Sequence, residues 1–499
     1  MESDYKKGYK KVLLCLPPLE GDFKLAPSPP TSIGYLSEYL IKHKIEHEVL
    51  DMRLGYTLKD LKNKIRQFKP DLIGFSVLAS YKHNVTYDLI NAIKSDKYDI
   101  IIGGGHSSIK GKDLLNEVSV QYSLKYEGEK TFVELCGGIP LEKIEGLIYR
   151  KNGEIVENPH NSFLDAKELP FPKYGKFELK KYSRKKINIV TSRGCPYSCT
   201  FCSISNVMGK KVRERTNEGV ISELKFWYDQ GYREFNVADD DFAQNKQRTI
   251  DLCSGIERSG MKGLYLSCGN GIRADNINRE VLTAMKKAGF REFRMGVEVG
   301  NDKMLKIIKK GETLEQIEKA IKLSCDMGFN VGLNFLMGFP GETEEDIRDS
   351  FRLAQKYPVD ATSFYGIIPF PGTELYEEVK RKNLLIEGDY LQITGQNSDE
   401  PAFSTPELSI EKRRELLNEA RKIEEKIIRN VFIRNTKKKF GIFSFIITNV
   451  ILYKPVYQSL VKICSKYKLF KKIAIFLTTK FNIRNVGNLM RGEMHQKGS

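Results

Sequence analysis

Three of the nine cysteines in this chain lie close together, at Cys195, Cys199 and Cys202. Three residues and then two residues separate them, so one compact loop presents three thiolates to a corner of a metal cluster. Four-iron clusters usually take four cysteine ligands, and no nearby cysteine completes this set. The fourth iron would then stay open to a ligand from outside the protein, as the open position of a catalytic metal does.

A structural zinc site is the alternative for this loop. Zinc loops prefer paired CxxC motifs with two further ligands, and neither Cys nor His occurs within twenty residues on either side. The other six cysteines are scattered singly, which is not a disulfide framework. The pattern favours an iron–sulfur cluster in a reducing cytoplasm, with zinc or bare thiols as the alternatives.

The CxxxCxxC spacing, with the aromatic Phe201 before the last cysteine, resembles the radical S-adenosylmethionine (SAM) superfamily. More narrowly, residues 10–385 resemble the group that has an N-terminal cobalamin-binding domain. The resemblance implies a 4Fe-4S cluster on Cys195, Cys199 and Cys202, whose open iron binds the amino and carboxylate groups of SAM. It also implies an external electron donor of the flavodoxin or ferredoxin type, and cleavage of SAM to methionine and a 5′-deoxyadenosyl radical.

Other SAM contacts follow from the resemblance. Asp239, Asp240 and Asp241 end a predicted strand where the family receives the methionine ammonium group; a polar strand end or a helix cap is the alternative. Asn270 and Arg273 resemble the family's ribose and carboxylate contact. Arginine suits that role because its planar fork binds a carboxylate through two hydrogen bonds, although a surface salt bridge would also explain it.

Two further segments extend the resemblance, and Phe201 is assigned to SAM with them. Glu298 lies on a predicted interior strand, where a carboxylate flanked by valines would be costly without a partner. Gly338 and Pro340 resemble the loop that approaches the adenine, since glycine permits close approach; a plain tight turn is the alternative. No catalytic side chain is assigned.

The N-terminal segments that match the group include a strand end at Ser76, three glycines at Gly103, Gly104 and Gly105, and Glu127. The glycines would let the nucleotide loop of cobalamin lie against the backbone, and Ser76 could face the corrin. We therefore predict that these five residues bind cobalamin.

One departure concerns the lower face of the corrin. Carriers that ligate cobalt use a DxHxxG loop, but the segment from Asp51 to Tyr56 has Arg53 in place of the histidine. Cobalt could not be held from below in that manner, and His106 is a poor substitute because a histidine beside a glycine turn is more often a hydrogen-bonded loop residue. Bound cobalamin is the expectation, and a fold that has lost the cofactor is the alternative.

The rest of the chain must position these residues. Residues 1–135 alternate apolar strands with amphipathic helices, which predicts a doubly wound, Rossmann-like parallel sheet that binds ligands at its carboxyl edge. Residues 136–186 hold a predicted hairpin and a linker. Six further units in residues 187–390 predict a partial or complete β/α barrel of the TIM type, and residues 391–499 form a helical, basic C-terminal region with an amphipathic helix at 409–433.

The net charge of +17 is unevenly distributed. Residues 434–499 contain fourteen Lys or Arg and one acid, Glu493, so the main body is close to neutral and shows no nucleic-acid footprint. Basic and apolar residues alternate in this tail, which suits interfacial helices on an anionic membrane. A packed cap on the barrel or, less simply, nucleic-acid binding are the alternatives. We expect a cytoplasmic protein with peripheral membrane contact.

The resemblance implies methylation of an unactivated carbon, or a related radical rearrangement or ring closure. One SAM would donate the methyl group and a second would supply the radical. A radical SAM enzyme without cobalamin and a non-catalytic iron–sulfur carrier are the alternatives. The carrier is disfavoured because it needs none of the predicted SAM contacts. The substrate is a small molecule, or a lipid if the tail binds a membrane.

Overall fold

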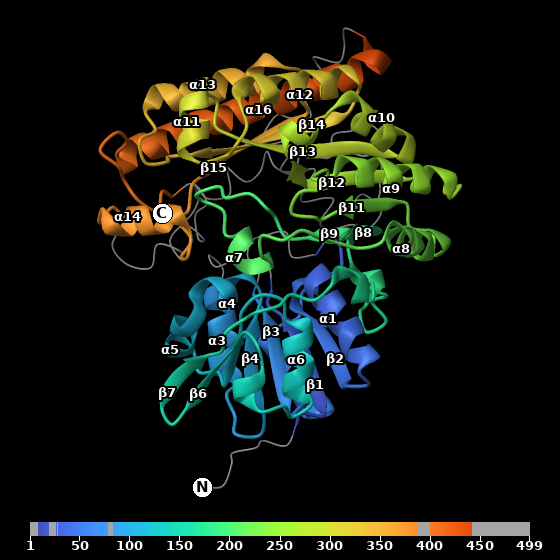
Figure 1. Ribbon diagram of the computed structural model, residues 1–499, viewed down its shortest axis with the longest axis vertical. Coiled ribbons are helices and arrows are strands. Elements are labelled where there is room, and N and C mark those ends of the chain that lie inside the picture. The colour runs from blue at the N-terminus through green and yellow to red at the C-terminus, as the bar shows by residue number, and fades with distance from the viewer. Residues whose placement is uncertain (1–7, 19–25, 27, 78–82, 387–399, 442–499) are drawn as a thin grey trace.

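The computed structural model describes residues 8–18, 26, 28–77, 83–386 and 400–441. Two mainly parallel sheets are stacked along its longest axis, and the carboxyl edge of the N-terminal sheet points toward the second sheet (Figure 1). The predicted basic tail is described only up to residue 441, and the rest of it, to which the membrane contact was assigned, lies outside the described residues. Within the described ranges, no helix is long and apolar enough to cross a membrane.

The N-terminal sheet has seven strands in the order β2-β1-β3-β4-β5-β6-β7. The first five are parallel and the last two are antiparallel. Their bounds are β1 Lys11–Leu16, β2 Glu46–Asp51, β3 Leu72–Ser76, β4 Asp99–Gly103, β5 Tyr122–Leu124, β6 Leu147–Lys151 and β7 Glu154–Glu157.

Strand β1 shows why helices cover both faces of this sheet. Its side chains alternate, so that Val12, Leu14 and Leu16 pack with helices α1 and α6, whereas Leu13 and Cys15 pack with α2 and α3. All five side chains are buried, as in a doubly wound fold. The helices are α1 Thr31–Lys42, α2 Leu58–Phe68, α3 His83–Ile93, α4 Gly105–Lys110, α5 Leu114–Glu117 and α6 Glu129–Cys136.

The predicted hairpin turns at Asn152 and Gly153, whose φ angles of 53° and 85° are both left-handed. A type I′ turn requires this conformation, and Asn-Gly adopts it readily. The hairpin pairs with β5 and so extends the N-terminal sheet beyond residue 135. Sequence reasoning missed β5 because three residues are too few to show a strand period.

The second sheet has six parallel strands in the order β15-β14-β13-β12-β11-β8. Because β8 and β15 are its two edges, the barrel is partial rather than complete. The strands are β8 Lys186–Ile189, β11 Glu234–Val237, β12 Tyr265–Ile272, β13 Phe290–Glu298, β14 Asn330–Met337 and β15 Ala361–Gly366, with a small pair β9 Ser192–Arg193 and β10 Arg213–Glu214.

Helices follow most of these strands. On the outer side of the sheet lie α8 Asn217–Asp229, α9 Lys246–Arg258, α10 Arg279–Ala288, α12 Leu314–Asp326 and α13 Glu344–Lys356 (Figure 1). The shorter helices are α7 Ile204–Met208, which faces the N-terminal domain, α11 Asp302–Ile307 and α14 Glu374–Arg381. Helix α13 begins with a capping box, in which Thr343 and Asp346 bond each other's backbone amides. This box sets where the preceding loop ends.

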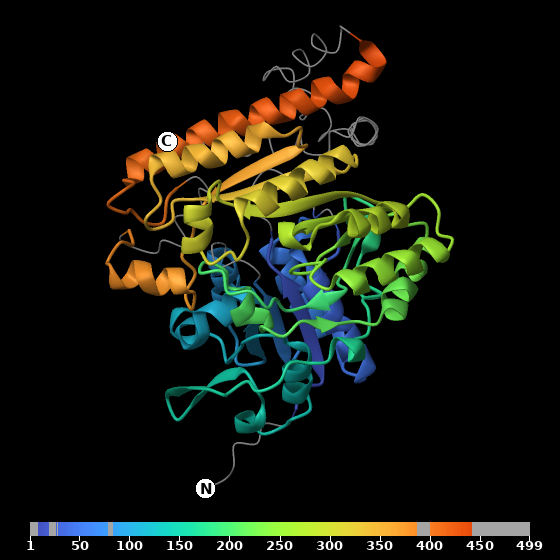
Figure 2. The same ribbon diagram turned by 45° about the horizontal axis from the view of Figure 1, so that its top comes forward.

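The long C-terminal helix α16, Ile410–Phe440, runs alongside α13 and β15 (Figure 2). It continues seven residues past the predicted end at Ile433. The Arg434 guanidinium donates to the carbonyl of Pro358 and to Asp360 at 2.6 Å. Helix α16 therefore closes one edge of the partial barrel.

Candidate functional site

The three predicted cluster ligands lie on one loop, residues 194–202, between β9 and α7. We call it the cluster loop. At its start the Gly194 amide donates to Asp240 at 3.0 Å. Farther along, the Thr200 amide donates to the carbonyl of Ile308 at 3.0 Å. The loop is thus fixed by segments that follow β11 and β13.

All three cysteines are partly exposed, whereas Cys253 and Cys268 are buried in the barrel core. Burial raises the pKa of each thiol of the loop. The pKa of Cys202 is raised to about 12, mainly by burial and in part by the nearby Cys199 and Cys195. The bare thiols are therefore neutral, and metal binding would deprotonate them. In the described part of the chain no three His, Cys, Asp or Glu side chains already converge on a single ion. Three neighbouring, accessible thiols on an anchored loop nevertheless suit a cluster, which is larger than one ion.

Asp239 is buried and has a structural role. Its carboxylate accepts hydrogen bonds from the Thr191 amide at 2.6 Å, the Thr191 hydroxyl at 2.5 Å and the Ser192 hydroxyl at 2.8 Å. These bonds tie the end of β11 to the segment between β8 and β9. Of the three predicted aspartates, Asp239 thus has its oxygens turned toward the protein.

The next two aspartates lie closer to the cluster loop. Burial raises the pKa of Asp240 to about 6, although the hydrogen bond from the Gly194 amide lowers it. Burial likewise raises the pKa of Asp241 to about 6. Asp241 also accepts from the side-chain amide of Asn276 at 2.7 Å. Both carboxyl groups would gain by binding a cation, because a positive charge favours their ionised form.

Arg273 makes contacts that the resemblance did not predict. Its Nε and Nη2 donate to Asp275 at 3.1 and 2.9 Å, and its Nη1 donates to the carbonyl of Lys310 at 2.7 Å. The guanidinium lies over the ring of Tyr197, 3.6 Å from its centroid. The fork that was assigned to a bound carboxylate faces Asp275 here. The neighbouring Asn270 is exposed and donates to the carbonyl of Ala238 at 2.9 Å.

Glu298 ends β13 with a left-handed φ of 68°, beside a register shift in the pairing of β13 with β14. Such a conformation is costly for a residue other than glycine and persists where the surroundings impose it. Its carboxylate lies 3.2 Å from the ammonium of Lys310, which lies 3.6 Å from Glu312. Burial lowers the pKa of Lys310, but the two carboxylates outweigh it and raise the pKa to about 12.

Lys310 is the residue of this site that sequence reasoning missed. The signal was available, since a carboxylate predicted on an interior strand requires a partner, but no local pattern indicates which lysine supplies it. Lys310 also lies near enough to Cys199 for its charge to lower the pKa of that thiol. The site therefore contains a buried cation between two carboxylates and a predicted cluster ligand.

The predicted adenine loop follows β14. Gly338 has a φ of 96°, and the amides of Gly338 and Phe339 both donate to the buried Glu342. The next residue, Pro340, is buried. The ring of Phe339 meets that of Phe201 edge to face, with centroids 5.5 Å apart. This contact joins the predicted adenine loop to the cluster loop.

In the N-terminal domain four of the five predicted cobalamin residues lie at the carboxyl ends of β3 and β4. Ser76 ends β3 and Gly103 ends β4, while Gly104 has a φ of 100°. A Cβ on Gly104 would lie 2.7 Å from the carbonyl oxygen of Val77, so two backbones approach here as closely as glycine allows. Helix α4, which begins at Gly105, packs against α7 of the barrel.

Arg53 stands where cobalamin carriers that ligate cobalt have a histidine, and its side chain is paired. Arg53 donates to Asp51 through Nε at 2.8 Å and Nη2 at 2.6 Å, and the Tyr182 hydroxyl donates to Asp51 at 2.8 Å. A guanidinium held in this way offers cobalt no nitrogen lone pair. His106 is fully buried, stacks on His83 at 4.8 Å and bonds the Tyr87 hydroxyl at 2.8 Å, as a packed residue does.

Glu127, the fifth residue assigned to cobalamin, lies between the two domains, and both its carboxylate oxygens face arginines. One carboxylate oxygen accepts from Arg193 at 2.8 Å and the other from Arg213 at 2.6 Å, and Arg193 also donates to Glu129 at 2.8 Å. All four side chains are buried. We call this set the interdomain ion network. Its Arg193 immediately precedes the cluster loop.

Two protein-family models match residues of this chain. The family model described as the radical SAM superfamily matches residues 189–354, and the B12 binding domain matches residues 26–136. An uncharacterized methyltransferase of Pyrococcus horikoshii is 30% identical over 400 residues, or 77% of this chain and 86% of that protein. The chain belongs to the radical SAM superfamily. The cytidylyl-2-hydroxyethylphosphonate methyltransferase of Streptomyces wedmorensis is 24% identical, over 71% of this chain and 78% of that one.

Solved structures of radical SAM proteins share the fold. The cobalamin-dependent S-adenosylmethionine radical enzyme OxsB, with aqua-cobalamin and S-adenosylmethionine bound, matches with a TM-score of 0.72 at 20% identity, over 95% of this chain and 75% of that chain. The radical S-adenosylmethionine methyltransferase TsrM from Kitasatospora setae, with cobalamin and a 4Fe-4S cluster bound, has a TM-score of 0.66 at 22% identity, over 75% and 78%.

These matches confirm the predicted family, the fold and the cofactor set of 4Fe-4S cluster, SAM and cobalamin. The chain is a radical SAM enzyme with a B12-binding domain, and a non-catalytic iron–sulfur carrier is not supported. The individual residues assigned to each cofactor remain predictions.

Proposed function

We propose that this enzyme transfers a methyl group from SAM to an unactivated carbon of a small-molecule substrate, with cobalamin as the methyl carrier. One observation carries the proposal. Helix α4, at the carboxyl edge of the B12-binding domain, packs against α7, which begins two residues after Cys202 (Figure 1). The regions predicted to hold the two cofactors therefore meet at one interface, where a substrate could reach both.

When bound, the cluster and SAM supply a radical that removes a substrate hydrogen, and cobalamin supplies the methyl group. The protein's own part is binding and electrostatics. The cluster loop presents the three thiols, and Asp240 and Asp241 offer carboxylates to an ammonium group. Lys310 and Glu298 form an ion pair beside Cys199. The interdomain ion network holds the B12-binding domain against the start of the cluster loop.

Corrinoid binding tests the proposal. The full chain, expressed or refolded with hydroxocobalamin, should retain about one corrinoid per chain. Its spectrum should show no protein nitrogen on cobalt, because Arg53 bonds Asp51 where a histidine would stand. A chain that is colourless after cluster removal would contradict the proposal that it binds cobalamin. A corrinoid with a protein nitrogen on cobalt would contradict only the prediction that no side chain ligates the lower face.

We further propose that the basic tail contacts an anionic membrane. In that case we expect the substrate to be a lipid. Fourteen basic residues and one acid in residues 434–499 support the membrane contact, since each Lys or Arg near such a surface contributes about 1 kcal/mol. Full-length protein should sediment with anionic vesicles and much less with neutral ones. A truncation that ends at Gly441 keeps α16 and removes ten of these fourteen basic residues, so it should lose most of its vesicle binding but keep its cluster. If it aggregates or loses the cluster, the tail is instead a cap on the barrel.

A further inference from the structure

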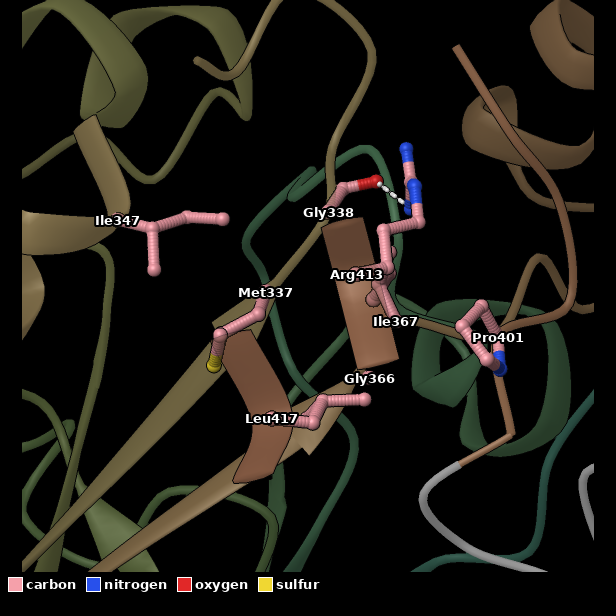
Figure 3. A pocket seen from close by; sticks show the side chains of 8 residues that line it. All are labelled: Met337, Gly338, Ile347, Gly366, Ile367, Pro401, Arg413 and Leu417. Atoms are coloured by element: carbon pink, nitrogen blue, oxygen red, sulfur yellow. Dashed lines mark hydrogen bonds between the residues drawn. The ribbon is translucent and has the colours of Figure 1, made fainter. Parts of the chain in front are cut away.

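Arg413 of α16 reaches the loop that follows β14. It lies in the first turn of the helix, its side chain is buried, and its Nη1 donates to the carbonyl of Gly338 at 2.7 Å (Figure 3). The two residues are 75 positions apart in the sequence. The carbonyl of the predicted adenine loop is therefore held by an element outside the six-stranded sheet.

The guanidinium of Arg413 is fixed on its other sides. Its Nε donates to the carbonyl of Leu408 at 3.2 Å, and its Nη2 donates to the Thr405 hydroxyl at 3.2 Å. It also lies over the ring of Phe403, 4.4 Å from the centroid. A group fixed by two other hydrogen bonds and a ring loses little further freedom when it holds the Gly338 carbonyl.

Glu342 holds the same peptide segment from its amide side. It accepts from the amide of Phe339 at 2.9 Å and from that of Gly338, and it is fully buried. Burial raises the pKa of Glu342 to about 7, and the positive charge of Arg413 acts against this rise. The loop is thus clamped between a buried cation and a buried carboxyl group.

Water could not replace Arg413 without cost. The small pocket beside the contact is lined mainly by apolar side chains, among them Met337, Ile367 and Leu417 (Figure 3). A buried carbonyl that loses its donor is left unsatisfied, which is unfavourable when nothing replaces the hydrogen bond. Removing the guanidinium should therefore let the loop shift rather than leave it in place with a water.

The loop is also coupled to the cluster loop. The ring of Phe339, next to Gly338, packs edge to face on Phe201, which directly precedes Cys202. A shift of the loop would therefore change the contact made by the aromatic residue assigned to SAM. The chain of contacts runs from α16 through Gly338 and Phe339 to the cluster loop.

We propose that Arg413 is a positioning residue of the SAM site, which places the C-terminal helix among the determinants of SAM affinity. It acts through the Gly338 carbonyl and does not touch SAM itself. The inference rests on the proposed function, because the adjacent loop must be the one that receives the adenosine part of SAM.

The test compares SAM affinity with cluster content. Arg413→Met keeps the length and apolar stem of the side chain and removes every donor. Equilibrium dialysis of labelled SAM against the reconstituted full chain, without reductant, should give a Kd about 10-fold higher than wild type, since about 1.4 kcal/mol corresponds to tenfold. Iron content and cluster absorbance should stay unchanged.

Arg414→Met is the matched control. The Arg414 side chain is 46% exposed and pairs with Glu400, so its loss should leave the Kd for SAM at the wild-type value. Arg413→Lys covers the case in which the methionine variant does not fold. A lysine lacks the planar fork that bonds Gly338, Leu408 and Thr405 together, so its Kd should rise about 3-fold.

The outcomes distinguish a failure of the role of Arg413 from a failure of the proposed function. A wild-type Kd in a folded, cluster-containing Arg413 variant would overturn the inference and leave the proposed function standing. A wild-type chain that holds its cluster but binds no SAM would overturn the proposed function and the inference with it.

Discussion

Replacing Cys195, Cys199 and Cys202 together by alanine should abolish both the absorbance of the reconstituted cluster and all formation of 5′-deoxyadenosine. The three thiols are the partly exposed sulfur ligands of one anchored loop, and iron–sulfur clusters are held by cysteine thiolates. Without them no electron reaches SAM through a cluster. The readouts are the visible spectrum after anaerobic reconstitution and chromatography of the products formed with reductant and SAM.

Single replacements of Cys253 and Cys268 by alanine are the controls for this experiment. Both side chains are almost inaccessible to solvent, at 0% and 1% exposure, and belong to the barrel core. They should leave the cluster intact. The assignment of the cluster loop would be wrong if the triple variant still formed 5′-deoxyadenosine.

The variant Glu127→Gln should lower the free energy of unfolding by about 3–5 kcal/mol, because it removes a charge from a buried network and leaves its partners uncompensated. Glu127 accepts from both Arg193 and Arg213, and both arginines are buried at 9% exposure. Urea denaturation of the cofactor-free chain measures the effect.

Glu374→Gln provides the comparison for an exposed ion pair. Glu374 and Lys309 are 2.7 Å apart and both 56% exposed, so the loss of this pair should cost no more than about 1 kcal/mol. If Glu127→Gln destabilised the chain no more than Glu374→Gln, the interdomain ion network would not hold the domains together in the way we describe.

The elements with clear local signals were predictable from the sequence. The sequence predicts a helix at Arg279–Ala288, and α10 has these bounds because Asn278 caps its start and Gly289 ends it in a left-handed conformation. The sequence also predicts a strand at Tyr265–Cys268, but β12 continues four residues farther, to Ile272. Its final residues are glycine-rich and carry no strand period, yet Ile272 pairs with Met295 of β13.

The residues of the site likewise differ in how far the sequence alone predicts them. The cysteine spacing is local, so the sequence alone indicates the cluster loop. The charge partners are not local: Lys310 reaches Glu298 only because of the turn after α11, and Arg413 reaches Gly338 only because α16 closes the barrel edge. The contacts of Glu127 depend on the packing of two domains, which no pattern within either domain reports.

One anaerobic sample of the full chain, reconstituted with iron, sulfide and hydroxocobalamin, shows whether the chain cleaves SAM with a cluster while it holds cobalamin. Its iron, zinc and corrinoid contents are determined, followed by the 5′-deoxyadenosine formed after addition of SAM and reductant. We expect about four iron atoms and about one corrinoid per chain, with 5′-deoxyadenosine formed only when reductant is present. A chain that holds zinc in place of iron, or that holds the cluster yet forms no 5′-deoxyadenosine, would contradict this expectation.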